Sequence, residues 1–424
     1  MDSLGNKVGI IGCGAVGRSI ITFLRKKFPT ITLSITDQRS LTQQELEFLT
    51  LHNVIHVDYE YRNAFIALQD QIFISPGIDR TPFLYAQHKW AEEVDLFFEY
   101  CTKPVVAITG SAGKTSTVLL LEHILKKQGV RAIACGNVGY PLLSAVLEQE
   151  DVDYFIAELS SFQLEFTTQC TPDYALITNL SDNHLDRHIT LESYRNAKSL
   201  IFKNQKNSQY ACLPFELFQK FALVTEHQKV VLFSSTDNNY NITQKLSDMT
   251  RLANWNSICT LLELIEKLPT TEQLEEYCAD FALEHRVEYV RTYKNMLFYN
   301  DSKATLPLST QNALSYFKTQ PIILMLGGFS KGVDRKPFIQ SLPNNIIHIE
   351  CFGLEALELA SYCALFDRSY TAHETIKEAF DHALTITSDH VVILFSPAGA
   401  THTHEFANYK ERGNYFKSLV HNLD

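Results

Sequence analysis

Short runs of apolar residues recur along the chain, and several are followed by stretches in which apolar residues return every three or four positions. The first pattern predicts buried strands, and the second predicts helices that cover a sheet. Alternation of the two is typical of an α/β fold with parallel strands joined by crossover helices. The expected strands are 8–11, 31–35, 72–74, 105–108, 154–157, 175–178, 322–326, 347–349 and 391–395.

Two helices have clear apolar faces. Val118, Leu121 and Leu125 stand at helical spacing after the strand 105–108, and segment 376–384 has the same spacing between the last two strands. At roughly 150 residues per domain, a chain of 424 residues should form two or three domains. Segment 92–103 is expected to connect the first sheet to the second, and a third set of strands begins near residue 283.

Composition places the chain among ordinary globular proteins, because apolar residues make up 45% and charged residues 20%. A formal net charge of −11 argues against a general basic face for nucleic acid or an anionic membrane. No apolar run approaches the ~18 residues of a membrane span, and no signal-peptide pattern precedes the first motif. We therefore expect a cytoplasmic protein with no membrane insertion. The nine scattered cysteines lack C-x-x-C spacing and predict reduced structural thiols rather than a zinc site.

A glycine-rich turn follows the strand 105–108 and reads Thr109-Gly-Ser-Ala-Gly-Lys-Thr-Ser116. Bare backbone amides and a helix N-terminus can face a phosphate, Lys114 adds positive charge, and Thr115 can ligate Mg²⁺. The general Walker pattern wants glycine where Ile108 stands, so a plain strand-to-helix turn remains the alternative. The expected ATP-phosphate residues are Gly110, Ser111, Ala112, Gly113, Lys114, Thr115 and Ser116.

A second glycine motif lies near the N-terminus. Gly12, Gly14 and Gly17 follow the first strand, and Asp37 lies 20 residues beyond Gly17, which matches the dinucleotide fingerprint. The motif could hold NAD or another nucleotide, or it could only allow close packing of helix on strand. Asp37 could bind a sugar hydroxyl or simply end a strand.

Polar side chains follow other strands. Glu158 comes at the end of strand 154–157, at the sheet edge where open α/β sheets build ligand sites, and a carboxylate there suits Mg²⁺. His184 lies in the loop after strand 175–178, although a single loop histidine is more often only solvated. Segments 300–305 and 327–334 each place a lysine among small residues, and each alone would be an ordinary surface loop.

Taken together, these motifs resemble the Mur ligases over essentially the whole chain, most closely the members that add D-glutamate to UDP-N-acetylmuramoyl-L-alanine in peptidoglycan synthesis. The segments that carry the resemblance, in order, are the N-terminal glycine motif, Ser75-Pro-Gly-Ile78, Thr109–Thr115, Gly136-Asn-Val-Gly139, Glu158-Leu-Ser-Ser-Phe-Gln163, His184-Leu-Asp-Arg187, Ala197-Lys198, His285-Arg286, Asn300-Asp-Ser-Lys-Ala-Thr305, Gly327–Gly332 and Ser396-Pro-Ala398.

The resemblance implies three domains and a monomer. These are a Rossmann-like domain for the uridine nucleotide over 1–97, a central P-loop ATPase-like parallel sheet over 98–282, and a C-terminal Rossmann-like domain over 283–424 that brings the amino acid. It also implies ATP and two Mg²⁺ sites as cofactors.

The resemblance further implies roles for individual residues. Catalytic roles fall to Lys114, His184, Lys198 and Lys303. The implied Mg²⁺ ligands are Thr115, Glu158, His184 and Lys198. Lys198 would act as a carbamylated lysine, whose anionic oxygens could ligate the ion. Asn256, Arg286 and Asp301 join the glycine turn around ATP. The expected contacts of the uridine substrate are Gly14, Ala15, Val16, Asp37, Gln38, Arg39, Ser75, Gly77, Asn137, Ser160 and Gln163, and those of D-glutamate are Thr305, Lys331, Thr401 and Tyr409.

The implied reaction begins with attack of the substrate carboxylate on the ATP γ-phosphoryl group. The acyl phosphate that forms is then attacked by the amino group of D-glutamate, and Mg²⁺ and lysines stabilise the spreading negative charge.

Three segments depart from the family pattern. Val16 and Gln38 replace the usual residues near uracil, the adenine motif is reduced to Asn256, and segment 401–409 carries an extra residue where the amino acid is bound. A sister amide ligase with another amino acid or nucleotide therefore remains an alternative. An NAD-dependent oxidoreductase, or a binding protein with a decayed site, explains fewer of the motifs.

Overall fold

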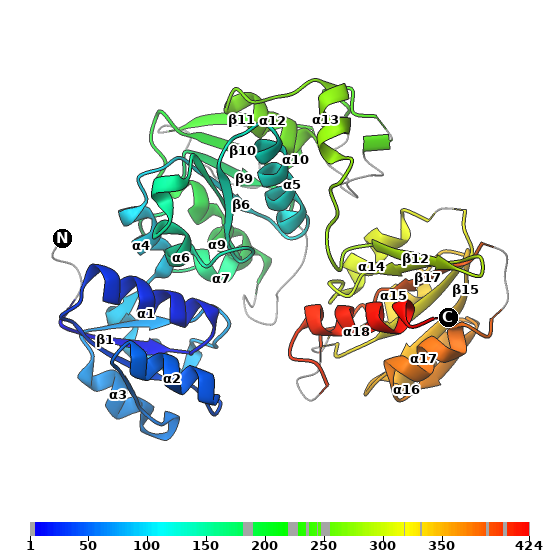
Figure 1. Ribbon diagram of the computed structural model, residues 1–424, viewed down its shortest axis with the longest axis horizontal. Helices are drawn as coiled ribbons and strands as arrows, with labels where there is room; N and C mark the ends of the chain where they lie inside the picture. Colours follow the sequence, from blue (N-terminus) through cyan, green and yellow to red (C-terminus); the bar gives the residue numbers. More distant parts are fainter. Residues whose placement is uncertain are drawn as a thin grey trace. The chain divides into compact units, whose positions relative to one another are not determined.

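A computed structural model describes residues 5–180, 190–218, 228–234, 237–243, 245–246, 255–317, 319–330, 333–386, 390–401 and 405–423. The chain divides into two compact units, one up to Ala279 and one from Asp280 onward in the described residues. The first unit contains two sheets and the second contains one (Figure 1). Each unit is described below by itself.

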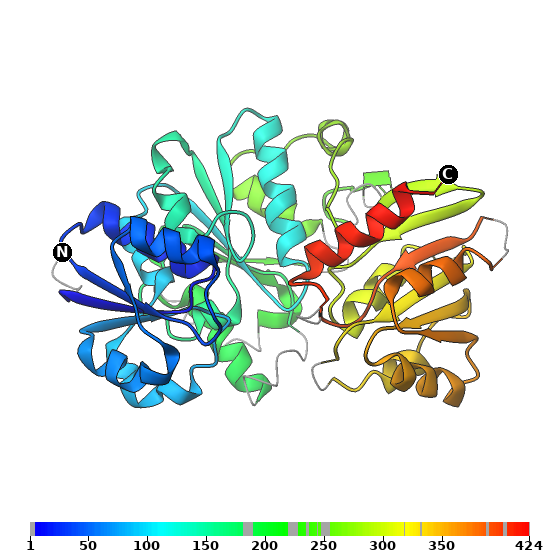
Figure 2. The ribbon, with the colours of Figure 1, turned by 60° about the horizontal axis from the view of Figure 1, so that its bottom comes forward.

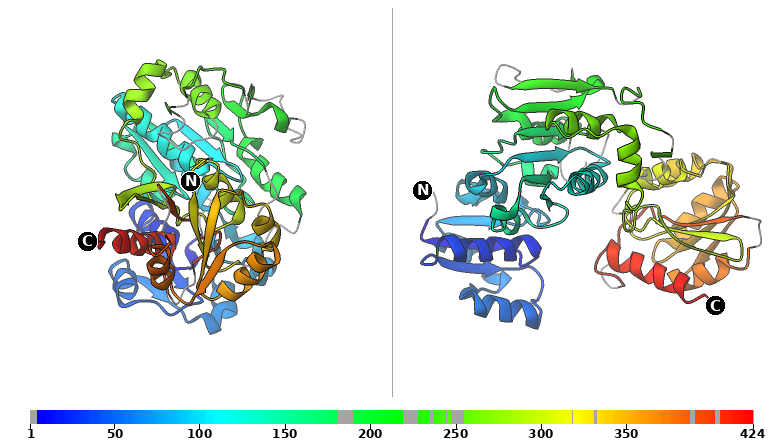
Figure 3. Two further views of the ribbon diagram at one scale, coloured as in Figure 1. Left: turned by 90° about the vertical axis from the view of Figure 1, so that its right-hand side faces the viewer. Right: turned by 45° about the horizontal axis from the view of Figure 1, so that its top comes forward.

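The N-terminal sheet has five parallel strands in the order β3-β2-β1-β4-β5. Its strands are β1 (Lys7–Ile11), β2 (Thr32–Thr36), β3 (Val54–His56), β4 (Gln71–Ile74) and β5 (Trp90–Ala91), and its helices are α1 (Ala15–Lys27), α2 (Gln43–Leu51), η1 (Tyr59–Tyr61), α3 (Arg62–Leu68) and η2 (Thr81–Lys89). Apolar residues of α1 pack on one face of the sheet, and those of α3 and η2 pack on the other. Figure 3 shows helices on both faces of this sheet.

The segment expected to be a plain connection contains a helix, α4 (Glu93–Tyr100). Val94, Leu96 and Phe97 are buried in a core that the first two sheets share. Ser19 on α1 accepts hydrogen bonds from the backbone N–H and the hydroxyl of Ser144, at 2.9 and 2.8 Å, which joins the two layers of the first unit.

The central sheet has six parallel strands in the order β11-β10-β9-β6-β8-β7. Its strands are β6 (Val105–Thr109), β7 (Ala132–Gly136), β8 (Tyr154–Glu158), β9 (Tyr174–Ile177), β10 (Tyr210–Pro214) and β11 (Lys229–Phe233), and its helices are α5 (Lys114–Lys127), α6 (Leu142–Val146), η3 (Gln149–Asp151), α7 (Ser161–Leu164), α9 (Leu191–Lys203), α10 (Phe215–Phe218), α12 (Asn256–Leu264) and α13 (Thr271–Cys278). Because β6 lies between β8 and β9, the loops after these three strands meet at one edge.

The second unit holds a six-stranded mixed sheet in the order β12-β13-β17-β14-β15-β16, in which only the β12–β13 hairpin is antiparallel. Its strands are β12 (Glu288–Tyr293), β13 (Met296–Asn300), β14 (Ile322–Gly327), β15 (Ile346–Phe352), β16 (Tyr370–His373) and β17 (Val392–Phe395), and its helices are α14 (Pro307–Leu314), α15 (Lys336–Gln340), α16 (Ala356–Leu365), α17 (Ile376–Ala383) and α18 (Tyr409–His421). Helices α14 to α16 cover one face and α17 and α18 the other. Figure 2 shows α18 in red beside the hairpin.

The predicted α/β class with parallel sheets is confirmed, and the predicted strands match observed ones to within one residue at their ends, except that strand 347–349 extends three residues further, over Ile346–Phe352. All nine cysteines are free, and all but Cys101 are buried. The domain boundaries near residues 97 and 282 stay predictions. In the described part of the chain, no helix is both long and apolar enough to cross a membrane.

Candidate functional site

The glycine turn after β6 forms a tight loop that leads into α5. Gly110 has φ of +149°, and a Cβ atom there would lie 2.0 Å from the Thr178 hydroxyl oxygen. Gly113 has φ of +78° and precedes the first residue of α5. The loop is held from β9, because the Asn179 side chain accepts from the backbone N–H of Ala112 and donates to its carbonyl, both at 2.9 Å. The loop passes so close to Thr178, the residue after β9, that only glycine fits at position 110.

Two lysines converge on one carbonyl oxygen of this loop. Lys114 Nζ donates to the carbonyl of Gly110 at 2.8 Å, and Lys198 Nζ, from α9, donates to the same oxygen at 2.9 Å. Lys198 is 1% exposed. Burial and the positive charge of Lys114 hold the pKa of Lys198 well below its usual value, while Glu158 opposes the shift. The amino groups of Lys114 and Lys198 thus lie side by side at this edge of the sheet, where they can donate hydrogen bonds to an anion.

Tyr194, which the sequence did not single out, supports Lys198 together with Thr109 and Ser111 of the glycine turn. Its Nζ lies 3.3 Å from the Thr109 hydroxyl oxygen and 4.6 Å from the centroid of the Tyr194 ring. The Tyr194 hydroxyl is hydrogen-bonded to the Ser111 hydroxyl at 3.1 Å. Tyr194 stands one helical turn before Lys198 on α9, and that spacing is the only sequence signal that could have paired them.

Glu158 ends β8 beside this loop and is 1% exposed. Its Oε1 accepts from Asn137 Nδ2 at 2.8 Å, and its Oε2 is buried with no hydrogen-bond partner among the described residues. A buried carboxylate oxygen without a partner is costly, and a cation beside it would remove that cost. Together with the hydroxyl of buried Thr115, Glu158 offers the oxygen ligands that Mg²⁺ prefers, so these residues fit the implied metal.

Residues expected near the uridine substrate adjoin this carboxylate. The backbone N–H of Asn137 donates to the Glu158 carbonyl at 2.9 Å. Ser160 and Gln163 cap α7 reciprocally: the Ser160 hydroxyl donates to Gln163 Oε1 at 2.9 Å and accepts from the Gln163 N–H at 3.3 Å. The structure thus brings Asn137, Ser160 and Gln163 to the same strand end as Glu158.

The N-terminal glycine motif is a closely packed turn. A Cβ atom at Gly17 would lie 2.0 Å from the carbonyl oxygen of Gly12, which explains the glycine there. The Asp37 carboxylate accepts from the backbone N–H of Cys13 at 2.7 Å and from that of Arg39 at 3.0 Å. Asp37 therefore has a structural role in the turn as well as its predicted contact with substrate.

The other expected contacts of the uridine substrate lie at the same sheet edge. Arg39 forms a two-pronged pair with Glu45, at 2.9 and 2.5 Å, and this pair lowers the pKa of Glu45 to about 2. The Ser75 hydroxyl donates to the Gly12 carbonyl at 3.3 Å. The surfaces open to solvent there are those of Gly14, Ala15, Gln38, Arg39 and Gly77, with Val16, Asp37 and Ser75 partly exposed.

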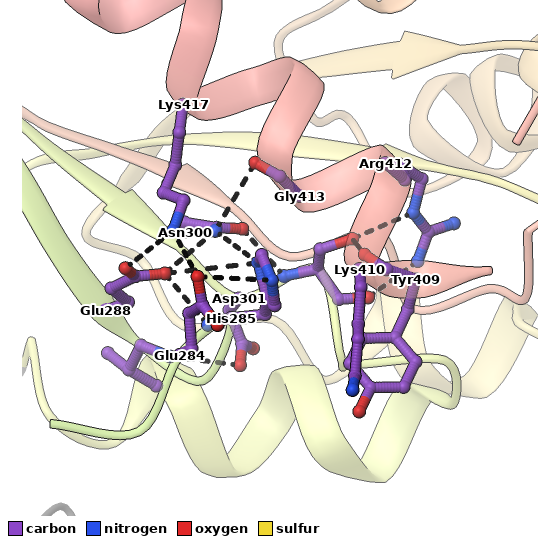
Figure 4. Close-up of polar contacts among 12 residues, drawn as sticks. Glu284, His285, Glu288, Asn300, Asp301, Tyr409, Lys410, Arg412, Gly413 and Lys417 are labelled. Atoms are coloured by element: carbon purple, nitrogen blue, oxygen red, sulfur yellow. Dashed lines mark hydrogen bonds and ion pairs between the residues drawn. The ribbon is translucent and has the colours of Figure 1, made fainter.

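In the second unit, Lys303 and Tyr409 lie together, with Lys303 Nζ 5.4 Å from the ring centroid. Figure 4 shows Tyr409 near a polar cluster that joins β12, β13 and α18. In this cluster Asn300 Nδ2 lies 2.9 Å from His285 Nδ1 and donates to Glu288 at 3.0 Å. His285 is 1% exposed, and burial lowers its pKa. The cluster holds Asn300 in place, and Asn300 is the first residue of segment 300–305, which contains Lys303.

Asp301 is buried in the second unit. It accepts from the Ser396 hydroxyl at 2.6 Å and from the Val287 N–H at 3.2 Å. Burial raises the pKa of Asp301 to about 7, against the opposing effect of the Ser396 hydrogen bond. The contact with ATP that was expected of Asp301 stays a prediction, and within its own unit the side chain ties β13 to the end of β17.

A pocket of about 330 Å³ in the second unit contains Thr401, one of the residues expected to bind D-glutamate. Arg412 also lines it, and its guanidinium donates to the Ser302 carbonyl at 2.7 Å and the Gly399 carbonyl at 3.0 Å. Burial lowers the pKa of Arg412 to about 10. Sequence reasoning missed Arg412, because it stands in a helix among charged residues that resemble a solvated face.

The remaining expected residues are placed as follows. Asn256 begins α12, and its side chain donates to the carbonyls of Ser234 and Asp237 at 2.7 and 2.5 Å. Arg286 and Thr305 are partly exposed. His184 and Lys331 lie outside the described residues.

Comparison with known proteins identifies the chain's relatives. Residues 108–264 match the Mur ligase middle domain. A UDP-N-acetylmuramoylalanine--D-glutamate ligase of Caldicellulosiruptor saccharolyticus is 30% identical over 457 residues, which cover all of both chains. The enzyme of that name in Geotalea uraniireducens is 30% identical over 455 residues, covering 100% of this chain and 99% of its own. This chain belongs to the Mur ligase family.

Solved structures agree in fold. The ligase MurC of Thermotoga maritima superposes with a TM-score of 0.60 at 15% identity, covering 98% of this chain and 99% of its own. MurF of the same organism, solved in complex with ADP, superposes with a TM-score of 0.58 at 15% identity, covering 99% of both chains. The chain thus has the Mur fold, and its full-length relatives identify it as a ligase, as the resemblance implied.

Proposed function

We propose that this Mur ligase uses ATP and Mg²⁺ to join D-glutamate to UDP-N-acetylmuramoyl-L-alanine in the cytoplasmic synthesis of peptidoglycan precursors. The observation that carries the proposal is the strand edge where Lys114, Lys198 and Glu158 converge around the glycine loop. Relatives that match along the whole chain are named for this reaction, which supports the choice of substrates.

In this proposal the glycine loop and the N-terminus of α5 hold the ATP phosphates. Backbone N–H groups of the loop face the anion, and Lys114, which now donates to loop carbonyls, turns to the phosphate oxygens. The carboxylate of the uridine substrate attacks the γ-phosphorus, the bond from that phosphorus to the bridging oxygen breaks, and ADP leaves. Lys114 stabilises the negative charge that spreads over the transferred group.

Glu158, Thr115 and His184 are proposed to hold Mg²⁺, which neutralises phosphate charge when it is bound. Lys198 is proposed to be carbamylated: its neutral amine adds to carbon dioxide, a proton is released, and the product is an anionic carbamate. Its burial and lowered pKa favour the neutral amine that this reaction needs. Asn137 holds Oε1 of Glu158 and leaves Oε2 available.

The amino acid is proposed to reach the acyl phosphate from the second unit. Lys303, Thr305, Lys331, Thr401 and Tyr409 are the proposed contacts, and Arg286 and Asp301 are proposed to contact ATP. The amino group of D-glutamate attacks the acyl carbon, and phosphate leaves from the tetrahedral intermediate. Phosphate is a far better leaving group than oxide, which is why the carboxylate must first be phosphorylated.

The test is the dependence of phosphate release on both substrates. We expect release from ATP only when UDP-N-acetylmuramoyl-L-alanine and D-glutamate are both present. Folded protein that releases no phosphate with the complete set would contradict the proposal. Asn137→Ala is expected to raise the Mg²⁺ concentration needed for half-maximal rate by about 10- to 100-fold, because it removes the partner of a metal ligand.

A sister ligase that uses a different amino acid is the second candidate, and one observation favours it. Glu374 and Glu405 line the same pocket as Thr401 and Arg412, so carboxylates stand near the residues expected to receive a dicarboxylic amino acid. A panel with D-glutamate, L-glutamate, glycine and a diamino acid separates the two. Acceptance of D-glutamate alone eliminates the second candidate, and preference for a diamino acid establishes it.

A further inference from the structure

A cluster of three histidines surrounds one buried carboxylate in the second unit, and none of the roles assigned above uses these four residues. Glu350, on β15, is 0% exposed. Its Oε1 lies 2.8 Å from His382 Nδ1 and 3.7 Å from His348 Nε2, and its Oε2 lies 2.7 Å from His373 Nε2. In the described part of the chain, all the ion-pair and hydrogen-bond partners of the Glu350 carboxylate are imidazoles, which carry no permanent charge.

The fold places these side chains together from three elements. His348 and Glu350 are two residues apart on β15 and so point to the same face of the sheet. His373 comes from the neighbouring edge strand β16, and His382 from the last turn of α17, which covers this face (Figure 1). The ring centroids of His373 and His382 are 5.3 Å apart, and those of His348 and His382 are 5.7 Å apart.

From this geometry we propose that His348, Glu350 and His382 form a binding site for a divalent transition metal, with zinc as the best match. The three ligand atoms all lie within 4.8 Å of one another. Two donors about 2.1 Å from a tetrahedral zinc ion are about 3.4 Å apart. The observed separations of 2.8 and 3.7 Å from Oε1 bracket that value. Two histidines and one glutamate are a ligand set that zinc uses.

The hydrogen bonds around the cluster prepare the ligands. His348 Nδ1 lies 2.8 Å from the Ser369 hydroxyl oxygen, and Nε2 lies 3.1 Å from the Thr371 hydroxyl oxygen. In the tautomer that carries its proton on Nδ1, that proton is donated to Ser369 and Nε2 keeps a lone pair for a metal. His373 donates through Nε2 to Oε2 and can keep doing so while Oε1 binds the metal. Such outer partners orient metal ligands and raise their basicity.

Metal binding requires one proton to move. His382 now donates from Nδ1 to Oε1, so Nδ1 must lose its proton and the ring must carry it on Nε2 instead. The His382 side chain is 37% exposed, which gives water a route for this exchange and the ion a route of entry. Bound metal would link α17 to β15. The metal would also place a full positive charge beside the buried Glu350 carboxylate, which now accepts hydrogen bonds only from imidazole rings in the described part of the chain.

The alternative is a purely structural cluster in which one protonated imidazole balances Glu350. Both readings explain why the carboxylate is buried, but only a metal site predicts stoichiometric uptake of an ion. The site shares no residue with the proposed ATP and Mg²⁺ machinery, so its test does not depend on the proposed function.

The test uses the full-length protein, freed of metal with a chelator and supplied with excess Mg²⁺. We expect calorimetry with zinc to show one more bound equivalent for the wild type than for His348→Gln or His382→Gln, and His373→Gln to bind about 10- to 100-fold more weakly. His421→Gln, which changes an exposed histidine of the same unit, should match the wild type. Circular dichroism checks that each variant is folded.

A measurement on the wild type alone complements the variants. Cobalt at this site should give the visible absorption of a tetrahedral ion without the near-ultraviolet charge-transfer band of a thiolate ligand, which excludes the cysteines as its source. Equal zinc uptake by the wild type and both folded ligand variants would overturn the proposal. A thiolate band from the wild type, or loss of zinc in His421→Gln, would also overturn it.

Discussion

Glu158→Gln removes the negative charge of the proposed metal ligand but keeps the shape of its side chain. The glutamine carbonyl can still accept from Asn137 Nδ2, as Oε1 does now at 2.8 Å, so the local packing should persist. The amide nitrogen replaces Oε2, the oxygen that has no hydrogen-bond partner among the described residues. The substitution therefore removes the anionic oxygen available to Mg²⁺ and changes little else.

The expected loss of Mg²⁺ affinity can be estimated from smaller changes made at other metal sites. Removing an outer partner of a metal ligand costs about 10- to 100-fold in metal affinity. Loss of a ligand's own charge should therefore cost at least about 100-fold, or roughly 2.7 kcal/mol. At a concentration of Mg²⁺ and ATP that is about 100 times the wild-type Kd, ligand binding stabilises the wild type by about 2.7 kcal/mol but the variant by only about 0.4 kcal/mol.

The assay combines the Mg²⁺ dependence of phosphate release with urea denaturation in the presence and absence of Mg²⁺ and ATP. Glu192→Gln is the matched control, because it removes one carboxylate from an exposed position on α9. This control should keep wild-type Mg²⁺ dependence and ligand stabilisation. A folded Glu158→Gln variant with the same Mg²⁺ dependence and turnover as the wild type would refute the assignment of Glu158.

Three further perturbations test other parts of the account. Lys198→Ala should lower kcat by about 10² to 10³-fold in the phosphate-release assay, because the proposed carbamate ligand of the charge-stabilising Mg²⁺ is lost, whereas Lys203→Ala at an exposed position of the same helix should not. Gly110→Ala should abolish ATP binding and destabilise the protein by about 1–3 kcal/mol in urea titrations. Gly129→Ala, whose Cβ would meet nothing within 4 Å, should strain only the backbone and leave ATP binding intact; equal ATP affinity in both variants would refute this account of the loop. Asp301 has its pKa raised to about 7 by burial, so the folded state holds a proton that the unfolded state has lost, and stability should fall as pH rises from about 4 to about 7. The predicted loss over the whole range is on the order of 4 kcal/mol, of which about 3 kcal/mol falls between pH 5 and pH 8. Asp301→Asn should remove this difference in urea denaturation at these two pH values; equal differences in both proteins would exclude Asp301 as the cause.

Much of the fold could be predicted, because strands buried on both faces are nearly continuous apolar runs. Runs such as Val105–Ile108 and Ile322–Leu326 are short and bounded by turn residues, which indicates buried strands without further information. Segment 92–103, which the sequence predicts to be a connection, contains a helix. The helix within it forms because Val94, Leu96 and Phe97 find a core shared by two sheets, which is a tertiary effect.

Only some residues of the candidate site could be predicted from the sequence, and the reason is physical. Glu158 ends a strand and Lys114 follows another strand after a short glycine turn, so their common edge could be inferred from parallel topology alone. Lys198 lies in the middle of a helix, and only the resemblance to a family pointed to it. Arg412 comes from a helix that meets its pocket only in the folded chain. His348 and Glu350 share one strand, but His373 and His382 come from other elements, and no spacing in the sequence links these two histidines to Glu350.

The central claim is that this ligase activates a substrate carboxylate by phosphorylation, and isotope transfer tests it most directly. UDP-N-acetylmuramoyl-L-alanine labelled with oxygen-18 in its free carboxylate is incubated with ATP, Mg²⁺ and D-glutamate, and the released phosphate is analysed by mass spectrometry. The account predicts one labelled oxygen in each phosphate formed, because the acyl phosphate leaves with an oxygen of the carboxylate. Unlabelled phosphate accompanied by amide product would contradict it.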